Sequence, residues 1–349
     1  MSRREGLMAT IKEVAELAGV TPTTVSNVLR GRGRVGTETR QRVLDAVDAK
    51  GYRPNLNARA LVERRAPTLA LMLGCITNPF YPEFTLQANN AARRHGRFLL
   101  VCNTDYEPDG GTGFLADVAG SLSDGILVAN NGDLRIEELQ AIQATGTPVV
   151  ISIWEFPDEP PGVPCVAFDS HKAGSIATEH LLELGHRRIG ALIGSAKNGI
   201  HGGRYEGFRD ALRSHKVKHV QADARFVTDT YQGGFDSATD LLTARADLTA
   251  LFVSNDLMAL GALNAVAALG LRVPEDVSIA SITNIEMASQ SRPALTTVAI
   301  PTAEMAEQGV ELLIQLGSGV HGVPDMIRTS DPVLIRRAST APAKQRTQP

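Results

Sequence analysis

The chain has 349 residues, of which 43% are hydrophobic and 21% are charged. This length predicts about two or three domains, and the apolar content excludes disordered, fibrous and disulfide-stapled proteins. No apolar run approaches the roughly 18 residues of a membrane helix, and the N-terminus lacks the apolar core of a secretory signal, so we expect a cytoplasmic protein.

The formal net charge of −3 is unevenly distributed. Residues 1–65 carry 13 Lys and Arg against 7 Asp and Glu, a balance of +6, whereas the other 284 residues carry 22 basic and 31 acidic groups, a balance of −9. A small basic segment ahead of a larger acidic body favours a polyanionic partner for that segment. Solvated helix faces would produce the same imbalance, so the charge alone does not decide between the two interpretations.

The segment 10–30 predicts two short helices separated by a tight turn. Thr10 and Glu13 have the spacing of a capping box, in which each side chain satisfies a free backbone N–H at the start of a helix. Gly19 ends this first helix, because glycine adopts positive φ at little cost. Thr21 is placed to cap the second helix, and Pro22 stands at its first position, where the missing N–H does no harm.

Ala15, Gly19 and Val25 provide the small residue, the turn glycine and the core residue of a helix-turn-helix. The second helix would turn short polar side chains outward, toward base edges or phosphates. These side chains belong to Thr23, Thr24, Ser26 and Asn27. Arg30, Arg32 and Arg34 follow in a glycine-punctuated loop suited to the DNA backbone. An ordinary helical hairpin with a polar face is the alternative.

A third helix is expected over 37–50, with Gly51 at its end. Its inward side chains would be Val43, Leu44 and Val47. Beyond a break in the chain, Asn55 is placed to cap a short helix over 56–63. These elements together predict a small helical head.

Three stretches between residues 9 and 61 carry a family resemblance. They are Ala-Thr-Ile-Lys-Glu-Val-Ala-Glu-Leu-Ala-Gly-Val-Thr-Pro-Thr-Thr-Val-Ser, Gly-Tyr-Arg-Pro-Asn and Ala-Arg-Ala-Leu. Through them the segment resembles the DNA-binding head of the lactose-repressor (LacI) family of bacterial transcription factors. The resemblance implies a hinge helix at about 55–63 that orders on operator DNA. Beside its twin in a dimer, this helix would insert Leu61 between base pairs from the minor groove, and Ala58 would let the two helices approach.

The DNA-binding residues expected on this basis are Thr10, Thr21, Pro22, Thr23, Thr24, Ser26, Asn27, Arg30, Arg34, Asn55, Ala58, Arg59 and Leu61. Two of them depart from the family pattern. Asn27 stands where many relatives have Arg, and Arg30 where many have Asn. The operator bases that are read therefore stay open.

From residue 68 onward, strand-like apolar runs alternate with amphipathic segments, which is the pattern of parallel sheets covered by helices. The expected strands are 68–74, 98–102, 125–129, 148–153, 188–194, 249–254, 277–282 and 296–300, and expected helices include 83–95, 174–184, 205–214 and 257–269. The fold class is thus an N-terminal all-α helix-turn-helix domain followed by an α/β body. The resemblance implies that this body has two doubly wound parallel-sheet subdomains, as in periplasmic sugar-binding proteins.

The resemblance also implies domain boundaries. A headpiece would cover 1–54, a hinge helix and linker 55–66, and an effector-binding and dimerisation domain 67–338. Within that domain, subdomain one would cover about 67–166 and 302–331, and subdomain two about 167–298 and 332–338, with a last strand near 333–337. The remaining residues, 339–349, are expected to form a flexible tail without leucine heptads, which favours a homodimer over a coiled-coil tetramer.

Further family signatures extend the resemblance over residues 9–338. They are Asn78-Pro79-Phe80-Tyr81, Glu183-Leu184-Gly185-His186-Arg187-Arg188-Ile189, Gly203-Arg204-Tyr205-Glu206-Gly207-Phe208 and Ser254-Asn255-Asp256. The effector-binding residues implied are Phe80, Tyr81, Trp154, Asn198, Arg204, Asn255 and Thr283. Aromatic rings can stack on a ligand, Arg204 offers a planar fork of donors, and Asn255 donates and accepts. Core packing of Phe80 and Trp154 and a surface ion pair of Arg204 are the alternatives.

The expected effector follows from two departures. Many relatives have acidic residues where this chain has Ile153 and Thr283-Asn284. A buried Arg204 without a counter-charge would be costly, so it would favour an anionic or phosphorylated metabolite over a neutral sugar.

No catalytic constellation is found in the sequence. The eight His show no HExxH spacing, no GxSxG motif occurs, and residues 109–113 do not fit a dinucleotide fingerprint. Cys75, Cys102 and Cys165 form no CxxC pair and lie in or beside apolar runs, so we expect buried free thiols. We expect no enzyme activity, no cofactor and no metal. The alternatives are a cytosolic α/β enzyme, which would need a nucleotide loop or a nucleophile, and a solute-binding protein, which would need an export signal.

The predicted function is that of a LacI-type transcriptional regulator, with a repressor as the first expectation. It would bind a pseudo-palindromic operator as a homodimer, at the nucleoid of a bacterial cytoplasm. An effector between the subdomains would shift them and thereby change the hinge helices, with a coupling of about 1–3 kcal/mol. Whether the effector is an inducer or a corepressor stays open.

Overall fold

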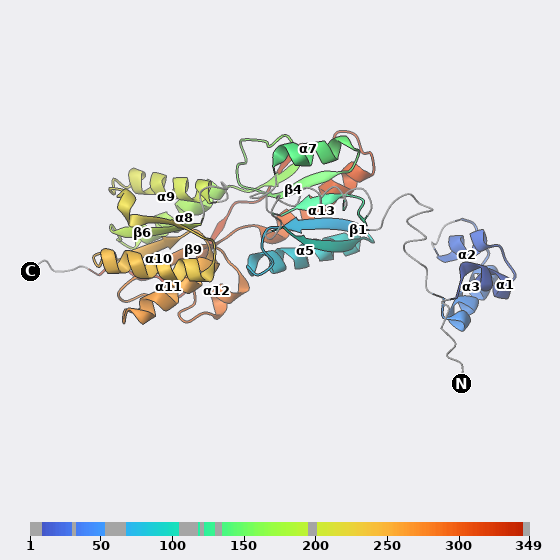
Figure 1. Ribbon diagram of the computed structural model, residues 1–349, viewed down its shortest axis with the longest axis horizontal. Coiled ribbons are helices and arrows are strands. Elements are labelled where there is room, and N and C mark those ends of the chain that lie inside the picture. The colour runs from blue at the N-terminus through green and yellow to red at the C-terminus, as the bar shows by residue number, and fades with distance from the viewer. Residues whose placement is uncertain are drawn as a thin grey trace, which may run out of the picture. The chain divides into compact units, whose positions relative to one another are not determined.

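The computed structural model describes residues 9–29, 33–52, 68–104, 118, 122–129, 135–194 and 201–344. The chain divides into two compact units, residues 1–66 and 67–349, which we call the head and the body. Figure 1 shows helices alone in the described head, and sheets flanked by helices in the body. None of the helices in the described ranges is long and apolar enough to cross a membrane.

The described part of the head contains the three helices that the sequence predicts. They are α1 (Ile11–Ala18), α2 (Pro22–Leu29) and α3 (Thr37–Lys50). Positive φ angles of 62° at Gly19 and 59° at Gly51 end the first and third of these helices. The small core consists of Val14, Ala15, Ala18, Val25, Val28, Val43 and Ala46.

The inward side of α3 differs from the prediction at one residue. Val43 and Ala46 are buried and Val47 is partly buried, but Leu44 is 39% exposed. Successive helical residues are about 100° apart, so positions 43, 46 and 47 share a face from which Leu44 points away. The prediction of Leu44 as a core residue is therefore wrong, and Ala46 takes its place.

The described body contains two six-stranded sheets, each in its own lobe (Figure 1). The first sheet has the order β11-β5-β4-β3-β1-β2 and is made of β1 (Thr68–Leu73), β2 (Phe98–Asn103), β3 (Ile126–Val128), β4 (Val149–Trp154), β5 (Cys165–Ala167) and β11 (Met326–Arg328). The second has the order β12-β10-β9-β8-β6-β7 and is made of β6 (Ile189–Gly194), β7 (Ala224–Val227), β8 (Ala250–Val253), β9 (Ser278–Thr283), β10 (Thr296–Ala299) and β12 (Val333–Ile335). Neighbouring strands pair in parallel, except that β10 and β12 are antiparallel.

The eight strands expected from apolar runs are all present, with bounds that agree within one residue. The predicted parallel α/β class is confirmed. Strands β5, β7 and β11 are absent from the prediction. Strands β7 and β11 lie at sheet edges and are only partly buried, so they leave no continuous apolar run, whereas β5 is missed although its three residues are buried.

Helices flank both sheets. Those of the first lobe are α5 (Phe80–Arg94), α7 (Ile136–Ala144) and α13 (Thr302–Gly317). Those of the second lobe are α8 (Ser170–Glu183), α9 (Gly202–Ser214), α10 (Tyr231–Ala244), α11 (Asp256–Ala268) and α12 (Glu286–Gln290), with a short 3-10 turn, η3 (Gln221–Asp223). Helices α5, α8, α9 and α11 correspond to predicted helices but begin earlier than expected. For α8 and α11 the reason is that the caps Asp169 and Asn255 lie before the apolar periodicity starts.

Two helix pairs in the second lobe pack so closely that their contacts require glycine. A Cβ on Gly174 of α8 would overlap the carbonyl oxygen of Arg204 in α9, and a Cβ on Gly207 of α9 would overlap that of His171. Helices α10 and α11 approach each other in the same way at Gly234 and Gly261. The backbones of each pair are therefore in direct contact.

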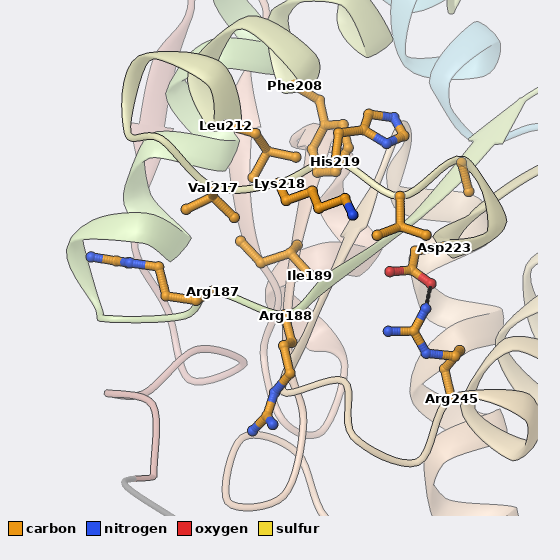
Figure 2. A pocket seen from close by; sticks show the side chains of 12 residues that line it. Arg187, Arg188, Ile189, Phe208, Leu212, Val217, Lys218, His219, Asp223 and Arg245 are labelled. Atoms are coloured by element: carbon orange, nitrogen blue, oxygen red, sulfur yellow. Dashed lines mark hydrogen bonds and ion pairs between the residues drawn. The ribbon is translucent and has the colours of Figure 1, made fainter.

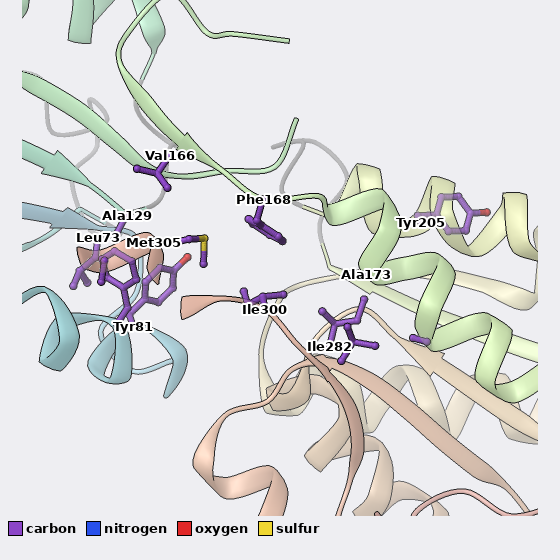
Figure 3. Close-up of a cluster of buried hydrophobic side chains, with 14 of the residues drawn as sticks. Leu73, Tyr81, Ala129, Val166, Phe168, Ala173, Tyr205, Ile282, Ile300 and Met305 are labelled. Carbon is purple, nitrogen blue, oxygen red and sulfur yellow. The ribbon is translucent and has the colours of Figure 1, made fainter. Parts of the chain in front are cut away.

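The two lobes share one apolar core. In the described part, the chain passes between the sheets in three short segments, residues 168–169, 300–301 and 329–332. Figure 3 shows Phe168 and Ile300 between the buried side chains of the two lobes. The crossings thus contribute side chains that pack the lobes against each other.

The segment after β12 differs from the expected flexible tail. The Ser339 side chain is fully buried, and its hydroxyl donates to the carbonyl oxygen of Ile279 at 2.6 Å. The backbone N–H of Ala343 donates to the carbonyl oxygen of Leu184 at 2.8 Å. Residues up to Lys344 are thus attached to the second lobe, because their backbone groups find partners without forming a helix or strand; residues 345–349 lie outside the described part.

Candidate functional site

The free side of α2 carries the polar residues that the sequence assigns to DNA recognition. Pro22 and Thr23 are exposed, and Thr24, Ser26 and Asn27 are partly exposed. The apolar side of the helix packs into the core of the head. A short helix held in this way can present its hydroxyl and amide groups to a DNA groove.

Thr10 and Thr21 both cap helices. The Thr10 hydroxyl accepts from the backbone N–H of Glu13 at 3.3 Å, and the Glu13 carboxylate accepts from the backbone N–H of Thr10 at 2.6 Å. The Thr21 hydroxyl accepts from the backbone N–H of Thr24 at 3.2 Å. The predicted capping box is confirmed. The two hydroxyls therefore stabilise the first turns of α1 and α2, in addition to any contact that they make with DNA.

The helical part of the head is electrically neutral. Residues 9–29 and 33–52 contain five basic and five acidic side chains, so the whole excess of +6 belongs to segments 1–8, 30–32 and 53–65. Base contacts are therefore expected from α2, and phosphate contacts mainly from the segments around it. Arg34, at the start of the described range 33–52, is exposed.

Several predicted site residues lie outside the described residues, and for them the prediction stays a prediction. In the head they are Arg30, Asn55, Ala58, Arg59 and Leu61, which include the expected hinge helix. In the body, Asn198 lies in the segment 195–200, which is also outside the described part.

A buried ion pair connects the two lobes. Arg204 of α9 is 4% exposed, and its Nη2 donates to Oε1 of Glu155 at 2.6 Å. Glu155, which follows β4 of the first lobe, is 6% exposed. The Nη1 of Arg204 donates to the carbonyl oxygen of Ser254 at 2.8 Å. Burial raises the pKa of Glu155, although Arg204 and His201 oppose this shift.

This ion pair removes the premise of the expected preference for an anionic effector. That expectation requires a buried Arg204 without a counter-charge, because Ile153 stands where a carboxylate is sought. Glu155 supplies the carboxylate instead, two residues further along. The register of β4 against β5 shifts between Ile151 and Trp154, and such an irregularity changes which side chains face the cleft. Arg204 therefore gives no reason to favour an anionic ligand.

A second polar group lies beside the ion pair. Nε2 of His201, at the start of α9, is 3.3 Å from Oδ2 of Asp229. Asn255 donates from Nδ2 to the other oxygen of Asp229, and its Oδ1 accepts from the backbone N–H of Met258 at 2.8 Å, which caps α11. Burial works to raise the pKa of Asp229, but His201, Asn255 and Arg204 together outweigh it and lower the pKa.

Three buried polar atoms in these groups have no hydrogen-bond partner in the described structure. They are Oε2 of Glu155, Nε of Arg204 and Nδ1 of His201. Buried polar atoms in folded proteins are seldom unpaired, so each calls for a water or a ligand. An acceptor, a donor and a ring nitrogen that can be either would suit hydroxyl groups, each of which both donates and accepts.

The predicted aromatic residues have different surroundings. Phe80, at the start of α5, packs against the core cluster shared by the lobes and against that of the second lobe. Tyr81 is buried in the shared core. The indole N–H of Trp154 donates to the carbonyl oxygen of Glu159 at 2.8 Å, and its ring meets Phe156 edge to face. Phe80 therefore lies between the lobes, whereas Trp154 is tied to the segment after β4.

A cavity of about 380 Å³ opens between the lobes beside Thr283. Its lining includes Glu83 of α5 and Thr283 and Asn284, which follow one another at the end of β9. The Glu83 carboxylate accepts from the backbone N–H of Glu286 at 2.8 Å, a direct contact between α5 and α12. Thr283 has a φ angle of 122°, which is strained for a β-branched residue and is typical of functional positions.

Sequence reasoning missed Glu155, His201 and Asp229. Ligand sites in open α/β sheets form at the carboxyl ends of the strands, so a polar residue directly after a predicted strand is the available signal. Glu155 carries that signal, since it follows the predicted strand 148–153 closely. Asp229 follows β7, a strand that is not predicted from the sequence, so nothing in the sequence marks Asp229 as a residue at the end of a strand.

Two family descriptions match the chain. Residues 10–55 match the family of bacterial regulatory proteins, lacI family. Residues 178–340 match the family of the periplasmic binding protein-like domain. The HTH-type transcriptional regulator DegA of Bacillus subtilis is 32% identical, with 96% of this chain and 99% of DegA covered. The HTH-type transcriptional repressor PurR of Aliivibrio salmonicida is 34% identical, with 88% and 92% covered. The solved structure of a transcriptional regulator CelR-cellobiose complex is 29% identical, with 95% and 99% covered and a TM-score of 0.69.

Proposed function

Because the chain belongs to the lacI family of bacterial regulatory proteins, whose members are transcriptional regulators and not enzymes, we propose that it is a repressor controlled by a small-molecule effector. It binds a pseudo-palindromic operator as a homodimer. The observation that carries this proposal is the exposed polar side of α2 on a confirmed helix-turn-helix.

In the proposed complex, Thr23 and Asn27 read base edges in the major groove. Ser26 and Thr24 lie on the same helix and support the contact, and the arginines around the helices neutralise phosphates. Leu61 opens the minor groove at the centre of the site, where the two hinge helices meet. The twofold symmetry of the dimer matches that of the operator.

Replacing Thr23 with Ala should weaken operator binding by roughly fivefold, because a base contact worth about 1 kcal/mol is lost. The salt dependence of binding should not change, since no phosphate contact is removed. The operator is first recovered by pulling down genomic fragments with the purified protein, and mobility shifts are then measured between about 50 and 200 mM salt.

The matched control is Arg34→Gln, which removes an exposed cation from the same unit. It should weaken specific and nonspecific duplexes alike and reduce the slope of log affinity against log salt by about 1. If wild-type protein showed no preference for the recovered operator over unrelated duplexes, the proposed function would be wrong.

We propose further that the effector is a neutral molecule with several hydroxyl groups, held between the lobes. The support is the unpaired donor and acceptor atoms of Glu155, Arg204 and His201, together with the internal neutralisation of Arg204. Cellobiose, with which the related regulator CelR forms a complex, is of this class. Binding would shift the balance between two arrangements of the lobes and so alter the hinge helices.

Replacing Arg204 with Lys should weaken effector binding at least about tenfold while operator affinity is retained. The Lys ammonium keeps a positive charge near Glu155, but it lacks the planar fork of the guanidinium. Calorimetric titration with neutral sugars and with their phosphorylated and carboxylated counterparts, followed by mobility shifts in the presence of the bound sugar, tests this and distinguishes an inducer from a corepressor.

Arg209→Lys is the control, because Arg209 lies on the same helix but is exposed. Its titrations should match those of the wild type. Tight binding of phosphorylated sugars without binding of neutral ones would contradict the proposed ligand class, and an unchanged response in Arg204→Lys would remove Arg204 from the site.

A further inference from the structure

Another hollow lies at the amino-terminal ends of strands β6 and β7 in the second sheet. It has a volume of about 200 Å³, and Figure 2 shows it between α9, the loop before β6 and the segment 217–220. Its floor includes the buried side chains of Ile189, Phe208 and Leu212. Arg204 contacts Ser254, which directly follows β8 at the carboxyl-terminal ends of the strands, so this hollow is separate from the proposed effector site.

Basic side chains outnumber acidic ones around this hollow. The lining cations are Arg187, Arg188, Lys218 and Arg245, and the lining carboxylate is Asp223. Arg245 forms ion pairs with Asp223 and Asp247. In the described structure, no carboxylate lies within ion-pair distance of the other three cations; Arg187 donates only to backbone oxygens. This positive cluster is unusual in a body that carries a balance of −9.

The positive surface continues into a neighbouring hollow of about 380 Å³, which shares Val217 and His219 with the first. This neighbouring hollow adds Arg209 and Arg213. Arg213 pairs with Asp210 at 2.8 Å, whereas the guanidinium of Arg209 lies over the ring of Tyr205. Burial and the nearby Arg209 lower the pKa of His219, so the positive charge comes from Arg and Lys side chains.

The side chains are arranged so that an anion could be enclosed. Figure 2 shows Lys218 lying across the hollow, whereas Arg187 and Arg188 extend away from it. Arg188 is exposed and forms no ion pair within hydrogen-bonding distance in the described structure, although its charge helps to lower the pKa of Asp247. Its long side chain can turn toward a bound anion. These three cations are themselves exposed, but the buried apolar floor beneath them keeps solvent from screening their charge on that side.

We propose that this hollow binds a small phosphate-bearing anion. Lys218 supplies a compact charge across the hollow, and Arg188 closes over the phosphate oxygens, to which a guanidinium donates two parallel hydrogen bonds. The volume admits a phosphate or pyrophosphate group but not a folded partner, and the proposal does not depend on the function proposed above.

The test is calorimetric titration of the full chain with pyrophosphate, with sulfate at equal ionic strength as the reference anion. Wild-type protein should bind pyrophosphate saturably and more tightly than sulfate. Lys218→Gln should weaken this binding at least about fivefold. Arg93→Gln, which removes one exposed positive charge from α5 of the first lobe, should change it less than about twofold.

Three results would overturn the proposal. Pyrophosphate binding that does not saturate would indicate screening of a general surface charge. An equal loss in Lys218→Gln and Arg93→Gln would place the binding elsewhere. Binding of unrelated duplex DNA that is lost in Lys218→Gln, without pyrophosphate binding, would make this surface a nucleic-acid contact instead. Far-ultraviolet circular dichroism of both variants shows whether they are folded.

Discussion

Replacing Gly207 with Ala should lower the free energy of unfolding by about 3 kcal/mol. The added Cβ would overlap the carbonyl oxygen of His171, and backbone of α8 surrounds it on the same side. Backbone atoms cannot turn away as a flexible side chain can, so α8 and α9 would have to separate, and overpacking of this kind is among the costly core changes. Urea unfolding followed by circular dichroism measures the effect.

The control for this substitution is Gly202→Ala in the same helix. A Cβ at Gly202 would meet no atom within 4 Å, so it should leave stability unchanged or increase it by about 0.5–1 kcal/mol through the loss of unfolded-state freedom. Equal effects of the two substitutions would show that the close contact between α8 and α9 does not limit stability.

Replacing Glu155 with Ala should cost about 3–5 kcal/mol of stability, because it leaves the buried Arg204 without a counter-charge. Because burial raises the pKa of Glu155, its carboxylate is a counter-charge only above that raised pKa, so the loss measured by urea unfolding should grow as the pH rises through it. The effect does not depend on an effector, since the pair is formed within the chain.

The double variant Glu155→Leu with Arg204→Met distinguishes charge compensation from packing. Removing both charges and keeping apolar volume should restore most of the lost stability, as is known for buried ion pairs in general. If the double variant were as unstable as the sum of the two single changes, the contribution of the pair would lie in its hydrogen bonds to Ser254 and in side-chain packing.

The backbone of this protein can be predicted from the sequence to a large extent. Strands such as β1 and β9 are buried along nearly their whole length and appear as continuous apolar runs, and α1 has its cap, periodicity and terminal glycine in plain view. These signals are local, so one sequence suffices to find them. Elements without these signals, such as the partly exposed edge strand β7, are not found from the sequence.

The cleft is harder to predict because its polar groups depend on tertiary contacts. Resemblance places Phe80 and Thr283 near the junction of the lobes, and Phe80 packs between them in the structure. Glu155 is missed although it closely follows a predicted strand, because only its tertiary contact with Arg204 shows that it belongs to the site. The argument for an anionic effector loses its premise with that one residue.

The three chain crossings between the lobes limit how a signal can travel. Segments 168–169, 300–301 and 329–332 connect the sheets side by side, so one lobe can turn against the other but cannot move away from it. A pair of fluorescent labels on α5 and α12, whose contact through Glu83 and Glu286 lies beside the crossings, would therefore report this rotation as a change in transfer efficiency.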